Sequence, residues 1–231
     1  IYNTTSKFLT NQKSLSKPWI ETPFFYKLLE NNNYKDEEKK LLTQFHEEGY
    51  LIIDLKLQNN DLQNVINDIY KYTEKGQNKY DKEIPNANDY KKSKNNDITI
   101  QSDVYTFNDS PRLFEGWRNG NYIKNLCLNK NILDTLSLLY GEKPFPFSTI
   151  NFIKGSNQPL HSDTIHFHTI PYYWMSGVWV ALEDVDKNNG ALRIIPRSHK
   201  WEMFHYEDLN IPHPDTIEDG EKVAYREYEE F

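Results

Sequence analysis

The pattern of hydrophobic and polar positions changes near residue 146, from helical periods to short apolar runs. In the first part, apolar residues recur three and four positions apart, which predicts amphipathic helices. One begins at Asp36, a suitable N-cap, and ends at Gly49; a second is centred on residues 62–69. Further helices are predicted around 24–29, 111–117, 120–127 and 132–140, the last closed by Gly141.

Short segments rich in β-branched and aromatic residues, bounded by Gly, Pro and Asn, predict strands. They span 50–54, 97–107, 147–154, 164–169, 175–183 and 191–195. Helices followed by strands are typical of an α+β fold in which helices cover one face of a β-barrel-like sandwich. Residues 74–97 are charged and poor in apolar side chains, which predicts a mobile loop or a lid over a binding site.

The length of 231 residues suits a single domain. We divide it into an N-terminal arm (1–35), a mainly helical part (36–145) and a strand-rich core (146–231).

The net charge of −7 and the absence of a basic stripe disfavour nucleic acid and anionic membranes as partners. No apolar run reaches the ~20 residues of a membrane span, and no signal peptide is expected. Cys127 is the only cysteine, which excludes a disulfide framework and fits a reducing cytoplasm.

Candidate chemistry is concentrated at residues 161–168, which hold three of the seven histidines and one carboxylate. On an extended chain His161 and Asp163 point the same way, ~6.5 Å apart along the strand. Such a pair can bind one edge of a metal ion. It supplies two of the three ligands in the 2-His-1-carboxylate triad of non-haem Fe(II) oxygenases.

A bare His-x-Asp pair is common, but its surroundings here resemble the phytanoyl-CoA dioxygenase family. In that family the pair precedes an apolar strand that ends near a Trp, then Asn-Gly-x-Leu and Pro-x-Ser-His. The matching positions are His161/Asp163, Trp179, Asn189-Gly-Ala-Leu192 and Pro196-Arg-Ser-His199. The resemblance implies a double-stranded β-helix (a jelly-roll or cupin-like core) and an enzyme that uses Fe(II) and 2-oxoglutarate to hydroxylate unactivated carbons.

The resemblance also implies roles for individual residues. His161 and Asp163 would bind the iron. Because related halogenating enzymes carry a small residue in place of the carboxylate, Asp163 favours hydroxylation. Asn151, Ser162 and Trp179 are expected near 2-oxoglutarate, and the alternative for Trp179 is an ordinary core aromatic.

Thr99 stands where some relatives have a lysine for a 2-oxoglutarate carboxylate, and this chain therefore departs from the family there. Gln158, His166 and His168 are candidates for substrate contacts, with a structural role as the alternative.

Outside this segment we expect structural roles. His46 is predicted to be a solvated surface histidine, Arg197 a surface residue, and His199 part of a fold-stabilising motif. Asn188-Asn189-Gly190 predicts a hairpin turn.

The third iron ligand of the family, a distal histidine followed by an arginine for 2-oxoglutarate, is not identifiable in this chain. His205 and His213 are available, but neither lies in an apolar strand pattern. We expect the last strands, with both residues, to lie beyond Phe231.

Three functions are therefore open. The first is an Fe(II)/2-oxoglutarate oxygenase acting on a small molecule or a carrier-linked acyl or sugar group. The second is a non-catalytic relative that serves as a binding or scaffold domain. The third is a cupin-like isomerase or hydrolase with another divalent ion, because two ligands do not select a metal.

Overall fold

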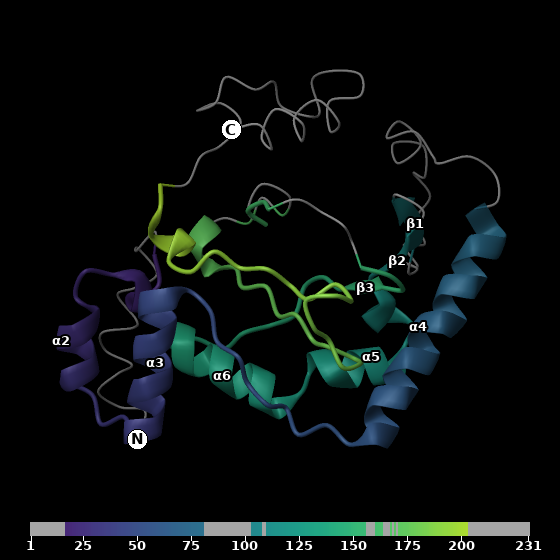
Figure 1. Ribbon diagram of the computed structural model, residues 1–231. Helices are drawn as coiled ribbons and strands as arrows, with labels where there is room; N and C mark the ends of the chain where they lie inside the picture. Colours follow the sequence, from purple (N-terminus) through teal and green to yellow (C-terminus); the bar gives the residue numbers. More distant parts are fainter. Residues whose placement is uncertain are drawn as a thin grey trace, which may run out of the picture.

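The computed structural model describes residues 17–80, 103–107, 110–155, 160–163, 167, 169 and 171–202, without the side chains of 75–80, 103–107, 110 and 111 (Figure 1). In chain order its elements are η2 (Trp19–Glu21), α2 (Phe25–Glu30), α3 (Asp36–Glu48), α4 (Asn59–Tyr80), β1 (Asp103–Phe107), β2 (Ser110–Phe114), η4 (Gly116–Arg118), α5 (Asn121–Cys127), α6 (Lys130–Tyr140), β3 (Ile150–Phe152), η5 (Tyr172–Trp174) and η6 (Ser198–Lys200).

The helices begin and end where local chemistry favours it. At the start of α3, the Glu38 carboxylate accepts a hydrogen bond from the Lys35 backbone N–H at 2.8 Å. The Asn129 side chain caps α6 by accepting from the N–H groups of Asn131 and Ile132. Gly49 and Gly141 close α3 and α6 with φ of 80° and 69°, a left-handed conformation that glycine adopts without steric cost.

One core cluster joins the N-terminal segments to α3 and α6 (Figure 1). Ile20, Phe25 and Leu42 are fully buried, and Leu139 and Tyr140 at the end of α6 pack among them. His46 belongs to this region, so its prediction as a solvated residue is wrong. Its ring stacks on Phe25 at 4.0 Å and its Nδ1 lies 2.5 Å from the Ile20 carbonyl oxygen.

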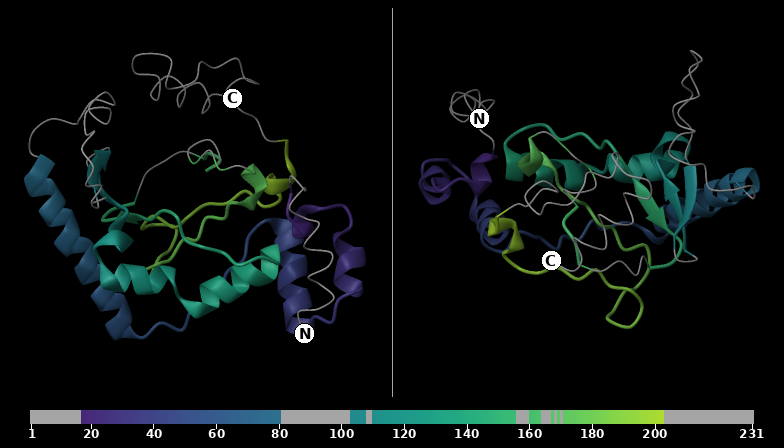
Figure 2. Two further views of the ribbon diagram at one scale, coloured as in Figure 1. Left: turned by 180° about the vertical axis from the view of Figure 1, so that it is seen from behind. Right: turned by 90° about the horizontal axis from the view of Figure 1, so that it is seen from above.

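A second cluster packs α4 and α5 against the sheet, as seen from behind and from above in Figure 2. Val65 and Ile69 of α4 meet Leu113 of β2 and Ile123 of α5.

Helix α4 continues to Tyr80, so residues 74–80 are helical and do not form the predicted loop. The rest of the predicted lid lies outside the described residues. Among the described helices, none combines the length and apolarity needed to cross a membrane.

The sheet is antiparallel with the order β1-β2-β3. Leu113 pairs with Val104 on one side and with Asn151 on the other. The helix predicted around 111–117 is therefore wrong, apart from the single turn η4. Apolar residues at 113, 114 and 117 satisfy helical spacing, but pairing with both neighbours stabilises Ser110–Phe114 as a strand.

Several other predicted strands are not formed. Residues 50–54, 175–183 and 191–195 belong to no strand, and of 147–154 only Ile150–Phe152 pairs. Much of the predicted strands 97–107 and 164–169 lies outside the described residues. The described part is thus helices plus a small antiparallel sheet, in agreement with the predicted α+β class, whereas the double-stranded β-helix stays a prediction.

The junction between β2 and β3 is held by Glu115, a non-glycine residue with a φ of 53°. Its carboxylate accepts hydrogen bonds from Trp117 Nε1 at 2.7 Å, Arg118 Nε at 2.9 Å and Ser148 Oγ at 2.6 Å. Burial by itself would raise the pKa of Glu115, but these hydrogen bonds and one from the Thr149 N–H outweigh it, and the pKa is lowered. The ionised carboxylate therefore connects the end of β2 and the turn η4 to the residues just before β3.

The C-terminal end of α3 is hydrogen-bonded to a segment from much later in the chain. We call this contact, between residues 197–200 and residues 46–49, the α3 clasp. The Arg197 N–H donates to the Glu48 carbonyl at 3.0 Å, and His199 Nε2 lies 3.0 Å from the His46 carbonyl. Lys200 Nζ donates to Glu47 Oε2 at 2.7 Å. Arg197 and Lys200 thus bring positive charge to the negative end of the helix. The contact of the His199 ring with the His46 carbonyl supports the fold-stabilising role predicted for His199.

We expect Gly49→Ala to destabilise the protein by more than about 2 kcal/mol. The left-handed φ costs an alanine about 1–2 kcal/mol, and the added Cβ would also overlap the His199 imidazole. Gly190→Ala is the matched control, since φ is also positive (94°) but the nearest atom to a Cβ lies 3.8 Å away. Urea denaturation of both variants measures the difference; equal losses would contradict the importance of the His199 contact.

We expect Glu115→Gln to lower the free energy of unfolding by about 1 kcal/mol at pH 7, because charge-assisted hydrogen bonds are lost. The pKa of Glu115 is depressed in the folded state, so its contribution is full above the unfolded value of 4.5 and lost as the pH falls through the folded pKa. The difference from wild type should therefore shrink in acid. Glu142→Gln, an exchange at an exposed position, should change little. A difference that stays constant with pH would show that the charge is not involved.

Candidate functional site

The predicted metal-binding pair lies close together in the structure. His161 Nε2 and Asp163 Oδ1 are 3.3 Å apart. Two ligands that each bind one ion at ~2.1 Å are separated by about 3 Å, so this geometry suits a shared ion. The exposed fractions of the two side chains are 21% and 52%, and the carboxylate is therefore accessible from solvent.

Two contacts fix the surroundings of Asp163. Its backbone carbonyl accepts a hydrogen bond from the Phe167 N–H at 3.2 Å, and the Phe167 ring meets Phe147 edge-on with centroids 6.0 Å apart. Gly177 lies close to the carboxylate, since an added Cβ there would come within 3.3 Å of Asp163 Oδ2. The carboxylate thus lies against a backbone position that has no side chain.

Asn151 lies on a strand, as expected, within β3. It pairs with Leu113, and its Oδ1 is buried only 2.6 Å from the place that a Cβ on Gly116 would take. Among the described atoms this oxygen has no hydrogen-bond partner. Because residues paired across strands share a face, Asn151 lies on the face that packs on α4 and α5. This placement favours a structural role, and its contact with 2-oxoglutarate stays a prediction.

The other described candidates are Ser162 and Trp179. Ser162 is exposed between the paired residues. Trp179 is 47% exposed and lies outside both core clusters, so it is not the ordinary core aromatic considered as its alternative. Neither environment assigns a ligand, and both roles stay predictions.

The remaining candidates, Thr99, Gln158, His166 and His168, lie outside the described residues, as do His205 and His213. Within the described part of the chain, no three His, Cys, Asp or Glu side chains are grouped as metal ligands. The structure therefore brings together two predicted ligands and leaves the third a prediction.

Gly177 and Tyr140 are neighbours of the site that sequence reasoning missed. Tyr140 contacts the residues just before Gly177 through its hydroxyl group. In the sequence, Gly177 stands out only as a glycine at the start of an apolar run. Tyr140 has no feature that points to the site, because its position is that of the last apolar residue of a predicted helix.

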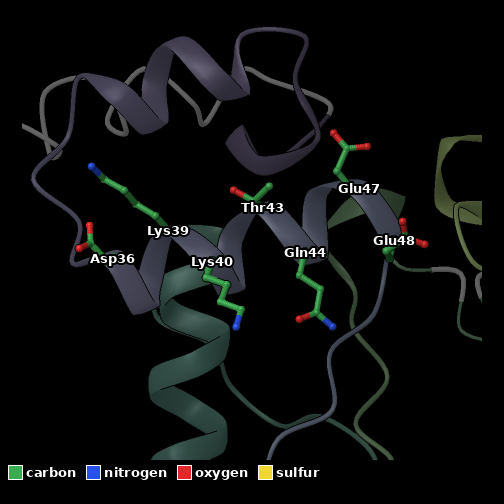
Figure 3. Close-up of a pocket in the computed structure, with 7 residues that line it drawn as sticks. All are labelled: Asp36, Lys39, Lys40, Thr43, Gln44, Glu47 and Glu48. Atoms are coloured by element: carbon green, nitrogen blue, oxygen red, sulfur yellow. The ribbon is translucent and has the colours of Figure 1, made fainter.

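An open depression of about 550 Å³ lies elsewhere, along α3 (Figure 3). Its lining side chains project from one helix in different directions, so they do not converge on a ligand. Glu47 and Glu48 at one end of it already bind Lys200 and Arg197. Hydrogen bonds from Lys200 and Tyr26 lower the pKa of Glu47 to about 2. One end of this surface is thus occupied by the α3 clasp, and we assign the surface no chemistry.

Comparison with known proteins agrees with the motif at His161 and Asp163. The family model described as Phytanoyl-CoA dioxygenase (PhyH) matches residues 45–230. This range includes the last turn of α3, the sheet and the His-x-Asp pair. The chain belongs to the phytanoyl-CoA dioxygenase family.

Curated relatives include "Phytanoyl-CoA dioxygenase, peroxisomal" of Bos taurus, 32% identical over 91 residues (31% of this chain and 27% of that protein). "Dioxygenase FUM3" of Gibberella moniliformis is 36% identical over 84 residues (32% of this chain and 27% of that protein). The matches thus span about a quarter of the length of these relatives. No solved structure matches the chain.

Proposed function

We propose that this protein is an Fe(II)- and 2-oxoglutarate-dependent dioxygenase. It hydroxylates a small-molecule or carrier-linked substrate and releases succinate and CO2, with its site at the open end of a double-stranded β-helix. The observation that carries the proposal is the 3.3 Å separation of His161 Nε2 and Asp163 Oδ1 within the region matched by the family.

The donor atoms of the pair fit the metal. An imidazole nitrogen and a hard carboxylate oxygen on one side of an ion are two thirds of the facial set that Fe(II) oxygenases use. Other divalent ions accept the same two donors, so the pair supports a metal site and the family supports iron. When bound, iron and 2-oxoglutarate supply the oxidising chemistry that acts on the substrate.

The residues of this chain hold and orient the reactants. His161 and Asp163 bind the ion, and Gly177 leaves room beside the carboxylate. A metal held by a 2-His-1-carboxylate set would keep coordination positions for 2-oxoglutarate and dioxygen. We place Thr99, Asn151, Ser162 and Trp179 toward 2-oxoglutarate, and Gln158, His166 and His168 toward the substrate.

For its location we propose the cytoplasm, on the single cysteine of the chain. The Bos taurus relative is named as peroxisomal, so a fluorescent fusion to the protein in its own cells, viewed beside a peroxisomal marker, discriminates the two compartments.

We expect the purified protein, given Fe(II), ascorbate and 2-oxoglutarate, to release succinate slowly even without its substrate. Asp163→Ala and His161→Ala should each lower this turnover at least about 100-fold, because a direct metal ligand is lost. Glu183→Ala removes an exposed carboxylate on a neighbouring segment and should leave the rate unchanged. Succinate release and Fe(II) affinity are measured on all four proteins.

The same measurements separate the alternatives. A wild type without Fe(II) affinity and without turnover would favour the non-catalytic binding domain. A wild type that binds divalent ions through His161 and Asp163 but never consumes 2-oxoglutarate would favour the isomerase or hydrolase.

A further inference from the structure

The segment beside Asp163 is fixed by a side chain from a distant helix. The Tyr140 hydroxyl, at the end of α6, donates to the Met175 carbonyl at 3.2 Å. It also lies 2.5 Å from Ser176 Oγ. Since a phenol has one proton, Tyr140 donates to Met175 and accepts from Ser176. One hydroxyl thus binds two consecutive residues of the extended segment.

Tyr140 is itself held rigidly. It is a member of the core cluster around Ile20, Phe25 and Leu42, and its ring lies 6.1 Å from that of Trp174. Burial raises the pKa of its phenol, which keeps the proton available for donation. The position of its hydroxyl is therefore set by the packing of α6 and not by the site.

The next residue along the segment is Gly177, where an added Cβ would lie 3.3 Å from Asp163 Oδ2. Residues 175–181 belong to no strand, so ladder pairing does not define their position. The two hydrogen bonds of Tyr140 lie one and two residues before the glycine that borders the carboxylate. A shift of this segment changes the space in which Asp163 is oriented.

We propose that Tyr140 is a positioning residue for the metal pair: through Met175 and Ser176 it holds Gly177 beside Asp163 and so keeps the carboxylate directed toward His161. This inference rests on the proposed function, because it concerns the same metal site. It adds a connection from the helical core to that site, through a hydroxyl group that touches neither metal nor substrate.

The first test is Tyr140→Phe, which removes only the hydroxyl group. Mn(II) alone serves as the probe, and its binding to the purified protein is followed by electron paramagnetic resonance. We expect the affinity to fall about three- to ten-fold, the effect of losing one or two hydrogen bonds that orient a ligand. Tyr122→Phe on α5, where the ring is exposed, is the control and should bind Mn(II) as the wild type does.

The second test acts from the other side of the contact. Gly177→Ala places a Cβ 3.3 Å from Asp163 Oδ2 and should weaken Mn(II) binding several-fold. Gly155→Ala is the matched control, because its Cβ would meet nothing closer than 3.9 Å. Ser176→Ala keeps the tyrosine and removes one of its partners, and it provides a milder variant if Tyr140→Phe folds poorly.

The outcomes are distinguishable. A wild type that does not bind Mn(II) overturns the proposed function, and the inference with it. A wild type that binds, with Tyr140→Phe, Ser176→Ala and Gly177→Ala equal to it, leaves the proposed function in place and overturns the inference. Melting temperatures without metal identify a purely structural role: if the variants lose stability but keep the wild-type Mn(II) affinity, Tyr140 does not position the pair.

Discussion

The packing of α3 against α6 is the interaction on which the rest of the described structure depends. Leu42 from α3 and Leu139 and Tyr140 from α6 meet around Ile20 and Phe25, and burial of these side chains is the largest favourable contribution available there. The two helix ends that emerge from this core each bind a later part of the chain. Tyr140 binds residues 175 and 176, and the end of α3 binds residues 197–200.

The extended segments after residue 174 therefore derive their position from helices (Figure 1). Val178 and Leu192 are about half exposed, whereas Leu182 packs against the second core cluster. Hydrogen bonds also attach these segments at their ends, to a hydroxyl group at one end and to helix carbonyls and carboxylates at the other. The candidate site lies next to the first of these attachments, which ties its geometry to the core.

The sequence predicts the helices well because their signals are local: apolar spacing within α3 and α6, and the glycines that end both. It predicts strands poorly, since a strand is defined by partners that spacing does not reveal. The run at 111–117 satisfied a helical pattern although Ser110–Phe114 forms a strand, and 175–183 satisfied a strand pattern without forming one. In the site, the His161–Asp163 separation follows from a local motif, whereas Tyr140 and the burial of His46 depend on tertiary contacts between segments far apart in sequence.

The contact between His199 and the end of α3 has a consequence for how the molecule folds and opens. His46 and His199 are 153 residues apart, so their meeting closes a longer loop than the packing of Leu42 of α3 on Leu139 of α6. During folding, the helical core can therefore form before the α3 clasp does. In the order of local opening, the clasp can detach while that core stays intact, and hydrogen exchange in residues 197–200 should then be faster than in α6.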